Sequence, residues 1–183
     1  MTLKKKIIRF SSCFLLALIA AFSFLLSDFN PMFQEEDFIH LQSELQKESP
    51  ELDSIIHLYE EIYKLNNKND HPSRAVLYNM HSYCFGSVFI KALFELKVSK
   101  DFTKSQCKRY ELQNSDFLYG NIGIKEAAKF YFSKKLNQLT TGEQIMFLVM
   151  SENPALYNPI RRKEKLMKKV KEYQQLIGID NNK

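Results

Sequence analysis

Glycine, proline and cysteine are scarce in this sequence of 183 residues. It has 5 Gly and 5 Pro, and Trp is absent. So few turn-forming residues argue against a turn-rich β-sandwich, a barrel or a collagen-like repeat, and they favour a helix-rich domain. The 3 Cys are an odd number, which argues against a scaffold held together by disulfide bonds.

The sequence also lacks the common local motifs of phosphate binding and metal catalysis. There is no glycine-rich phosphate loop, no H-E-x-x-H and no Cys/His cluster with the spacing of metal ligands. The histidines are scattered and are interpreted as ordinary surface or helix residues: His40, His57, His71 and His81. We therefore expect no metal site and no organic cofactor.

Apolar residues, by contrast, make up 45% of the chain, which excludes disorder throughout and suits one domain with its own core. The net charge of +5 is unevenly distributed. Residues 1–9 are basic, residues 10–72 carry eleven acidic against three basic residues, and residues 73–183 are basic again. The chain is therefore divided into a cationic start, an acidic stretch and a basic second half.

The N-terminal segment predicts a signal-anchor helix. Three lysines and Arg9 precede an uncharged run from Phe10 to Leu26, which is near the lower limit for a single membrane-spanning helix. Cations on this side place the N-terminus in the cytoplasm and the domain on the periplasmic or extracellular side of the cell (inner) membrane. A cleaved signal peptide is the alternative, but no small-x-small cleavage site follows the run cleanly.

Export across the membrane would affect the interpretation of two features, the cysteines and the basic C-terminal segment. Cys84 and Cys107 would lie outside the cytoplasm, where they could pair, although two buried free thiols fit equally well. The basic segment Ile160–Ile177 is not expected to bind nucleic acid, which an exported domain seldom meets. Its cations could contact anionic headgroups or pyrophosphate-bearing lipids, at about 1 kcal/mol each, or form a solvated helix face.

The apolar pattern divides the chain into four parts. Residues 1–27 form the basic start and the anchor, residues 28–51 an acidic stalk, residues 52–178 a helical domain and residues 179–183 a tail. Residues 74–98 suit one helix or two, because Gly86 interrupts the pattern. No segment alternates with a period of two, so the predicted fold class is all-α. The other helices are predicted at 53–65, 103–113, 124–134, 141–150 and 160–177.

A specific motif pattern runs without a gap from Gly123 to Pro159. Its first part, G-I-x-x-A-A-x-x-Y-F-x-K, is followed by L-T-x-x-E and P-x-x-Y-x-P. The pattern resembles the C-terminal motif region of glycosyltransferase family 51, the peptidoglycan glycosyltransferase domains of penicillin-binding proteins and monofunctional transglycosylases. Upstream, Ser99-Lys100-Asp101 and Tyr119-Gly120 resemble a further family motif, so the likeness covers residues 99–173. Residues matching these motifs that we expect to support the fold are Gly123, Ile124, Ala127, Tyr131, Phe132, Glu143, Pro154, Tyr157 and Pro159.

The resemblance implies a lysozyme-like transglycosylase-type domain, tethered to a membrane and active in bacterial peptidoglycan biosynthesis. Its partners would be the membrane, a lipid-linked disaccharide precursor and other cell-envelope proteins. An active member could use a divalent metal. Lys125, Lys129 and Lys134 are the candidate substrate-binding residues, because cations bind the pyrophosphate of such a precursor.

The catalytic motifs of the family are not intact. Its E-D-x-x-F-x-x-H motif supplies the general base, and the nearest match runs from Glu36 to His40 with Phe and His too close to the Glu. Glu36 is therefore the candidate catalytic residue. The T-Q-Q motif is missing, and the second Glu would fall near Ser87 with no Arg-Lys before it. Loss of a positioned base costs about 10²–10⁴ in rate, so the sequence predicts a truncated or divergent member, a pseudoenzyme candidate.

Three hypotheses follow for the function. The chain could be a divergent but active peptidoglycan glycosyltransferase that uses Glu36 as its base. It could be a non-catalytic scaffold, or a protein that binds the lipid-linked precursor. It could also be an anchored helical domain unrelated to the family.

Overall fold

The computed structural model describes residues 3–66, 71–78, 80, 83–84 and 86–178. Within this part the fold is all-α, as predicted, and its one β feature is an isolated bridge between Asp116 and Ile122. The predicted tail, 179–183, lies outside the described residues. The elements are α1 (Leu3–Leu25), η1 (Pro31–Gln34), α2 (Glu36–Leu45), η2 (Pro50–Leu52), α3 (Asp53–Leu65), α4 (Ser73–Leu77), α6 (Val88–Asp101), α7 (Lys104–Asn114), α8 (Ile124–Phe132), η3 (Leu136–Gln138), α9 (Thr141–Glu152) and α10 (Lys163–Leu176).

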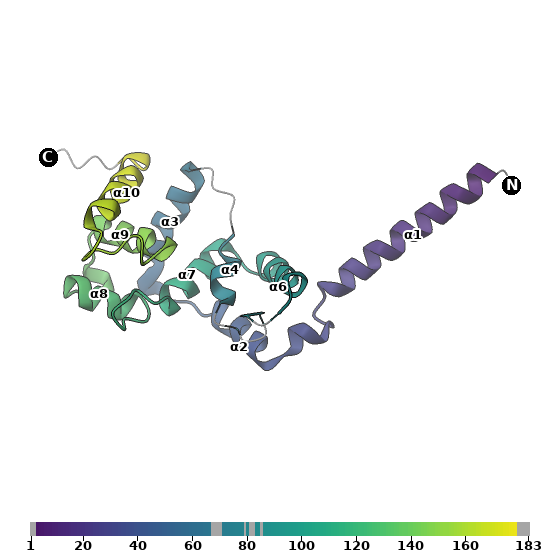
Figure 1. The fold of residues 1–183 in the computed structure, drawn as a ribbon, viewed down its shortest axis with the longest axis horizontal. Coiled ribbons are helices and arrows are strands. Elements are labelled where there is room, and N and C mark those ends of the chain that lie inside the picture. Colours follow the sequence, from purple (N-terminus) through teal and green to yellow (C-terminus); the bar gives the residue numbers. More distant parts are fainter. Residues whose placement is uncertain (1–2, 67–70, 79, 81–82, 85, 179–183) are drawn as a thin grey trace.

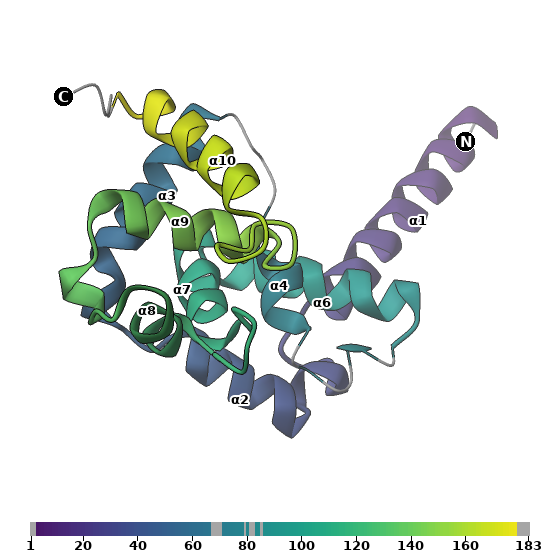
Figure 2. The ribbon, with the colours of Figure 1, turned by 60° about the vertical axis from the view of Figure 1, so that its left-hand side comes forward.

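Helix α1 projects away from the other helices as a long rod, with α6 near its base and α8 at the far end of the molecule (Figures 1 and 2). Among the described residues, no helix combines the length and the apolarity needed to cross a membrane. The uncharged part of α1, Phe10 to Leu25, is shorter than the roughly 20 residues of a typical span. The predicted transmembrane helix is therefore not confirmed.

The helices surround two hydrophobic cores. The first core joins α3, α8, α9 and α10, and it includes Leu112 of α7. The second joins η1, α2, α4 and α6, and it includes Cys107 of α7. Helix α7 therefore contributes to both cores.

The acidic stretch predicted to be a stalk forms η1 and α2. Its buried apolar residues, Phe33, Phe38, Leu41 and Leu45, belong to the second core, whereas Ile39 is exposed. The rings of Phe33, Phe38 and Phe94 contact one another there at centroid distances of 5.2–5.5 Å. Lys97 of α6 is buried as well, and its ammonium group pairs with Asp28 at 2.5 Å and with Asp101 at 2.7 Å. These contacts fix the chain that follows α1 against α6.

Local signals set several helix boundaries. Thr103 and Gln106 form a capping box at the start of α7, and Thr140 and Glu143 form another at the start of α9, as the sequence predicts for Thr140. The described residues of the segment 74–98 include the helices α4 and α6, and Ser87 caps α6.

Candidate functional site

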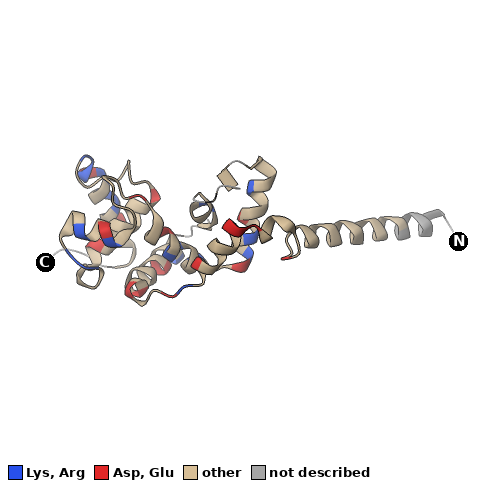
Figure 3. Ribbon diagram, turned by 90° about the horizontal axis from the view of Figure 1, so that it is seen from below, with Lys and Arg blue, Asp and Glu red and all other residues tan. Residues whose placement is uncertain are grey.

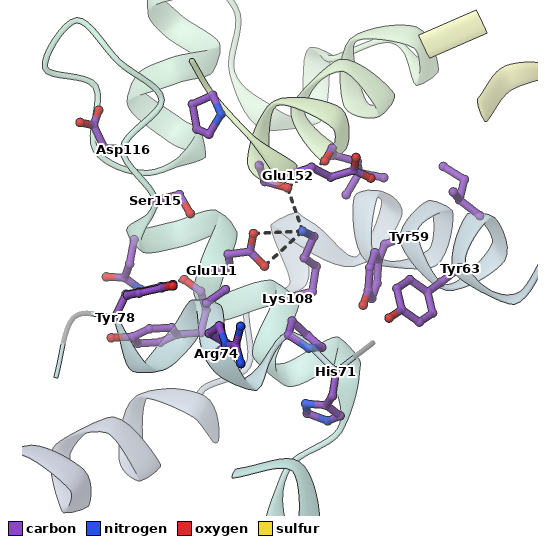
Figure 4. Close-up of a pocket in the computed structure, with 18 of the residues that line it drawn as sticks. Tyr59, Tyr63, His71, Arg74, Tyr78, Lys108, Glu111, Ser115, Asp116 and Glu152 are labelled. Carbon is purple, nitrogen blue, oxygen red and sulfur yellow. Dashed lines mark hydrogen bonds and ion pairs between the residues drawn. The ribbon is translucent and has the colours of Figure 1, made fainter. Parts of the chain in front are cut away.

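A cleft of about 1010 Å³ opens between elements of both cores. Figure 4 shows side chains from α3, α4 and α7 and from the end of α9 pointing toward it. The lining is rich in aromatic hydroxyl groups and in paired charges. Its tyrosines are Tyr59, Tyr63, Tyr78, Tyr110 and Tyr173.

A buried ion pair lies at the centre of the cleft. Lys108 and Glu111 are one turn apart on α7, and each side chain is only 8% exposed. The Lys108 ammonium group donates to both Glu111 carboxylate oxygens at 3.1 Å and to the Ser151 hydroxyl at 2.8 Å, and it lies 5.4 Å from the centre of the Tyr59 ring. Burial raises the pKa of Glu111, and the Lys108 charge offsets part of that rise.

The other groups around the cleft also have internal partners. The Tyr173 hydroxyl donates to Glu152, and burial, with this carboxylate, raises the pKa of Tyr173. On the opposite wall, the Arg74 guanidinium makes two hydrogen bonds of 3.1 and 3.2 Å to Glu95. Asp116 is exposed and accepts a hydrogen bond from the backbone N–H of Leu118 at 2.7 Å.

His71 is held as a neutral ring. The Ser73 backbone N–H donates to Nδ1 at 3.2 Å, which assigns the proton to Nε2, 3.1 Å from the Phe102 carbonyl. Burial is the main cause of a lowered pKa for His71. The hydrogen bond to the Phe102 carbonyl raises this pKa in part, and the nearby charge of Lys104 lowers it further. Both ring nitrogens therefore serve the local structure.

The candidate base Glu36 does not line this cleft. It is exposed, in the first turn of α2, and faces a separate cavity of about 610 Å³ shared with Glu35, Asp37 and His40. Tyr110 lines both cavities. The structure therefore separates Glu36 from the buried pair and from the candidate substrate-binding lysines.

Those lysines, Lys125, Lys129 and Lys134, do lie together, in a third cavity of about 620 Å³. Lys125 pairs with Glu51 at 2.5 Å, and Lys134 donates to both oxygens of Glu143 at 2.7 and 2.8 Å. Burial alone would raise the pKa of Glu143, but hydrogen bonds from Lys134 and Thr140 outweigh it and lower the pKa. That these lysines bind substrate stays a prediction.

The motif residues expected to support the fold have clear structural surroundings. Gly123, Ile124 and Ala127 are buried at the start of α8, and Tyr131 donates to the Phe117 carbonyl at 2.6 Å. Phe132 packs edge-on against Phe147 at 5.5 Å. Of the remainder, Pro154 lines the cleft, and Tyr157 and Pro159 are half-buried in the loop before α10.

Metal and disulfide chemistry have no assembled site in the described part of the chain. There, no group of three or more His, Cys, Asp or Glu side chains is arranged to hold a metal ion. Cys84 is an exposed free thiol and Cys107 a buried one, so the two do not pair. Burial raises the pKa of Cys107 to about 12.

The sequence pattern did not predict the buried ion pair of Lys108 and Glu111 on α7. A Lys and a Glu three residues apart are usual on solvated helix faces, and α7 carries many polar residues. The only available signal was their position between two apolar helices, which does not reveal burial.

Comparison with known proteins accounts for the motif pattern. Residues 85–177 match the sequence model of the family described as Transglycosylase. Penicillin-binding protein 4 of Bacillus subtilis (strain 168) is 32% identical over 103 residues, which are 52% of this chain and 16% of that protein. Penicillin-binding protein 1F of the same organism is 25% identical over 75 residues, 41% of this chain and 10% of that protein. The chain thus spans less than a fifth of the length of these relatives, yet more than half of it matches the family. It belongs to the transglycosylase family, glycosyltransferase family 51.

Proposed function

We propose that this chain is a transglycosylase-domain protein of bacterial cell-wall biosynthesis that binds the lipid-linked disaccharide precursor without polymerising it. The observation that carries the proposal is the state of the two glutamates of the cleft; its third carboxylate, Asp116, accepts the backbone N–H of Leu118. Glu111 is buried against Lys108, and Glu152 accepts the Tyr173 hydroxyl. A general base needs a carboxylate oxygen free to reach the acceptor hydroxyl.

The same cleft suits a carbohydrate ligand. Its volume is at the upper end of the usual range for small-molecule sites, about 300–1,000 Å³. Tyrosine rings can stack on the apolar faces of sugar rings, and their hydroxyls can bond to sugar hydroxyls. Tyr78, at 63% exposed, is the most accessible of these rings.

An active enzyme that uses Glu36 is the second candidate. Glu36 is exposed, lies in the first turn of α2 and faces its own cavity. The positive end of a helix favours a charged carboxylate there. This arrangement would leave the Glu36 carboxylate open to solvent.

The test uses the purified full-length chain with lipid-linked disaccharide-pentapeptide. We expect saturable binding and no glycan polymer, and we expect Tyr78→Ala to weaken binding about fivefold to tenfold through the lost ring contact. Phe130→Ala, which truncates an exposed aromatic side chain on α8, is the matched control and should bind as the wild type does.

Two results would contradict this proposal. If the wild-type chain does not bind the precursor, the proposed binding function is wrong. If the wild-type chain forms glycan polymer, the protein is catalytic, and loss of polymer formation in Glu36→Gln would identify Glu36 as its base.

We also propose that α1 attaches the protein to the cell membrane, with its N-terminus on the cytoplasmic side and the domain on the outer side. From Phe10 to Leu25, α1 carries no charged residue (Figure 3), and most of its large apolar side chains are exposed. Such a helix is unfavourable in water and favourable in lipid. Phe29, Val88 and Phe89, at 80%, 86% and 63% exposed, extend the apolar surface near its base.

Vesicle flotation measures this attachment. The wild-type chain is expected to float with phospholipid vesicles, and the double variant Phe14→Asp/Phe22→Asp to lose at least tenfold in partitioning, because each carboxylate opposes insertion by about 2.5–3.5 kcal/mol at the helix centre. Phe130→Asp on α8 is the control and should float normally. Equal flotation of all three proteins would show that α1 is not the attachment site.

A further inference from the structure

Four lysines converge on the cavity at the end of α8. Lys125 and Lys129 lie on the helix, and Lys134 and Lys135 follow its last turn. The cavity also contains the polar side chains of Ser133, Asn137 and Gln138, and Glu51 is its one carboxylate. It shares no lining residue with the 1010 Å³ cleft.

The charges in this cavity are not balanced. Glu51 pairs with Lys125, and Glu143, from outside the lining, pairs with Lys134. Among the described residues, Lys129 and Lys135 form no salt bridge. A carboxylate thus already occupies part of the cavity, and two ammonium groups beside it have no carboxylate partner.

Part of this arrangement has an ordinary structural explanation. Cations in the last turn of a helix interact favourably with its dipole, and this applies to Lys129. The dipole does not explain why Lys134 and Lys135, beyond the helix end, line the same hollow. Like charges gathered in a concave site repel one another unless an anion is bound there.

We propose that this cavity is a phosphate-binding site, separate from the cleft. Lys129 and Lys135 would bind the phosphate oxygens, and Lys125 would exchange Glu51 for the ligand. The volume of about 620 Å³ admits a phosphate together with the organic group that carries it. The inference does not depend on precursor binding in the cleft.

The position of the site bears on where the phosphate comes from. Figures 1 and 2 both place α8 at the end of the molecule away from α1. A headgroup of the bilayer that α1 would enter is therefore remote. This favours a phosphate on a soluble molecule or polymer over a lipid headgroup.

The test measures the Kd of inorganic phosphate and of pyrophosphate for the full-length chain by titration calorimetry. Lys129→Gln/Lys135→Gln is expected to weaken binding at least tenfold. Glu51→Gln is expected to tighten it about fivefold, the effect of removing one competing charge at contact distance near a solvated surface. The control, Lys165→Gln/Lys168→Gln, removes two exposed charges from α10 and should change the Kd less than twofold.

The Glu51 variant separates a specific site from general basic attraction. Equal weakening in the α8 and α10 variants, or an unchanged Kd in Glu51→Gln, would overturn the proposal. Phosphatidylglycerol vesicles, tested with the Phe14→Asp/Phe22→Asp chain, distinguish the sources. Vesicle binding that depends on Lys129 and Lys135 would identify a lipid headgroup as the source of the phosphate. Binding of inorganic phosphate or pyrophosphate without binding of vesicles would identify a soluble ligand.

Discussion

Replacement of Lys108 by methionine is expected to lower the free energy of unfolding by about 3–5 kcal/mol, the usual cost of leaving one charge of a buried pair without its partner. The Lys108 and Glu111 side chains are each 8% exposed, so Glu111 would lose most of the stabilisation of its charge with the ammonium group. Ser151 would also lose its 2.8 Å hydrogen bond from Lys108. Urea denaturation of the wild type and the variant at pH 7 measures the difference.

The pH dependence of this loss provides an independent check. Burial already raises the pKa of Glu111 in the folded protein, and removal of Lys108 raises it further. The penalty for ionising Glu111 is therefore present above its folded pKa and disappears as the pH falls toward the ordinary value of 4.5. The deficit of Lys108→Met should shrink between pH 7 and pH 4.5.

The double variant Lys108→Met/Glu111→Leu is the matched control. Apolar replacements of similar volume often recover the stability lost when a buried pair is broken. We expect it to unfold at a urea concentration near that of the wild type. A single variant that loses less than about 1 kcal/mol, with no dependence on pH, would show that Glu111 is hydrated rather than buried.

Replacement of Gly123 by alanine is the second large effect, and we expect it to lower the free energy of unfolding by about 2–6 kcal/mol. Gly123 has φ +79° and ψ 155°, a region that is essentially restricted to glycine and costs other residues about 1–3 kcal/mol. A Cβ atom there would also overlap the backbone oxygen of Gln113. Because that atom is backbone, relief requires movement of the end of α7 or the start of α8, and overpacking of this kind costs about 1–3 kcal/mol.

Gly120→Ala separates the two causes. Gly120 also has a positive φ, +77°, but a Cβ atom there would meet no atom within 4 Å. The Gly120→Ala variant should therefore lose only the free energy of unfolding that corresponds to conformational strain, about 1–2 kcal/mol. Equal losses of stability in the two variants, measured by thermal or urea denaturation, would show that the contact with Gln113 is unimportant.

Local chemistry made much of the fold predictable. The Thr140–Glu143 capping box and the break near Gly86 depend on residues close in sequence. The motif from Gly123 to Pro159 was informative for the same reason, because it encodes one helix, its turn and the start of the next. These signals do not require knowledge of distant contacts.

The sites were less predictable because they depend on contacts between distant segments. Glu51 reaches Lys125 across 74 positions of sequence, and Lys108 reaches Ser151 across 43. The burial of α2 depends on α4 and α6, which the acidic composition of residues 28–51 does not reveal. Glu36 had a motif-like neighbourhood, but its separation from the cleft is a property of the packed helices.

Helix α7 contacts α2 and α4 on one side and α3 and α8 on the other. It contributes Cys107 to one core and Leu112 to the other, and it also carries the ion pair in the cleft. The packing on both faces of this helix therefore fixes its position between the two walls of the cleft. A tilt of α7 would move both walls at once, and the opening available to a ligand would change with it.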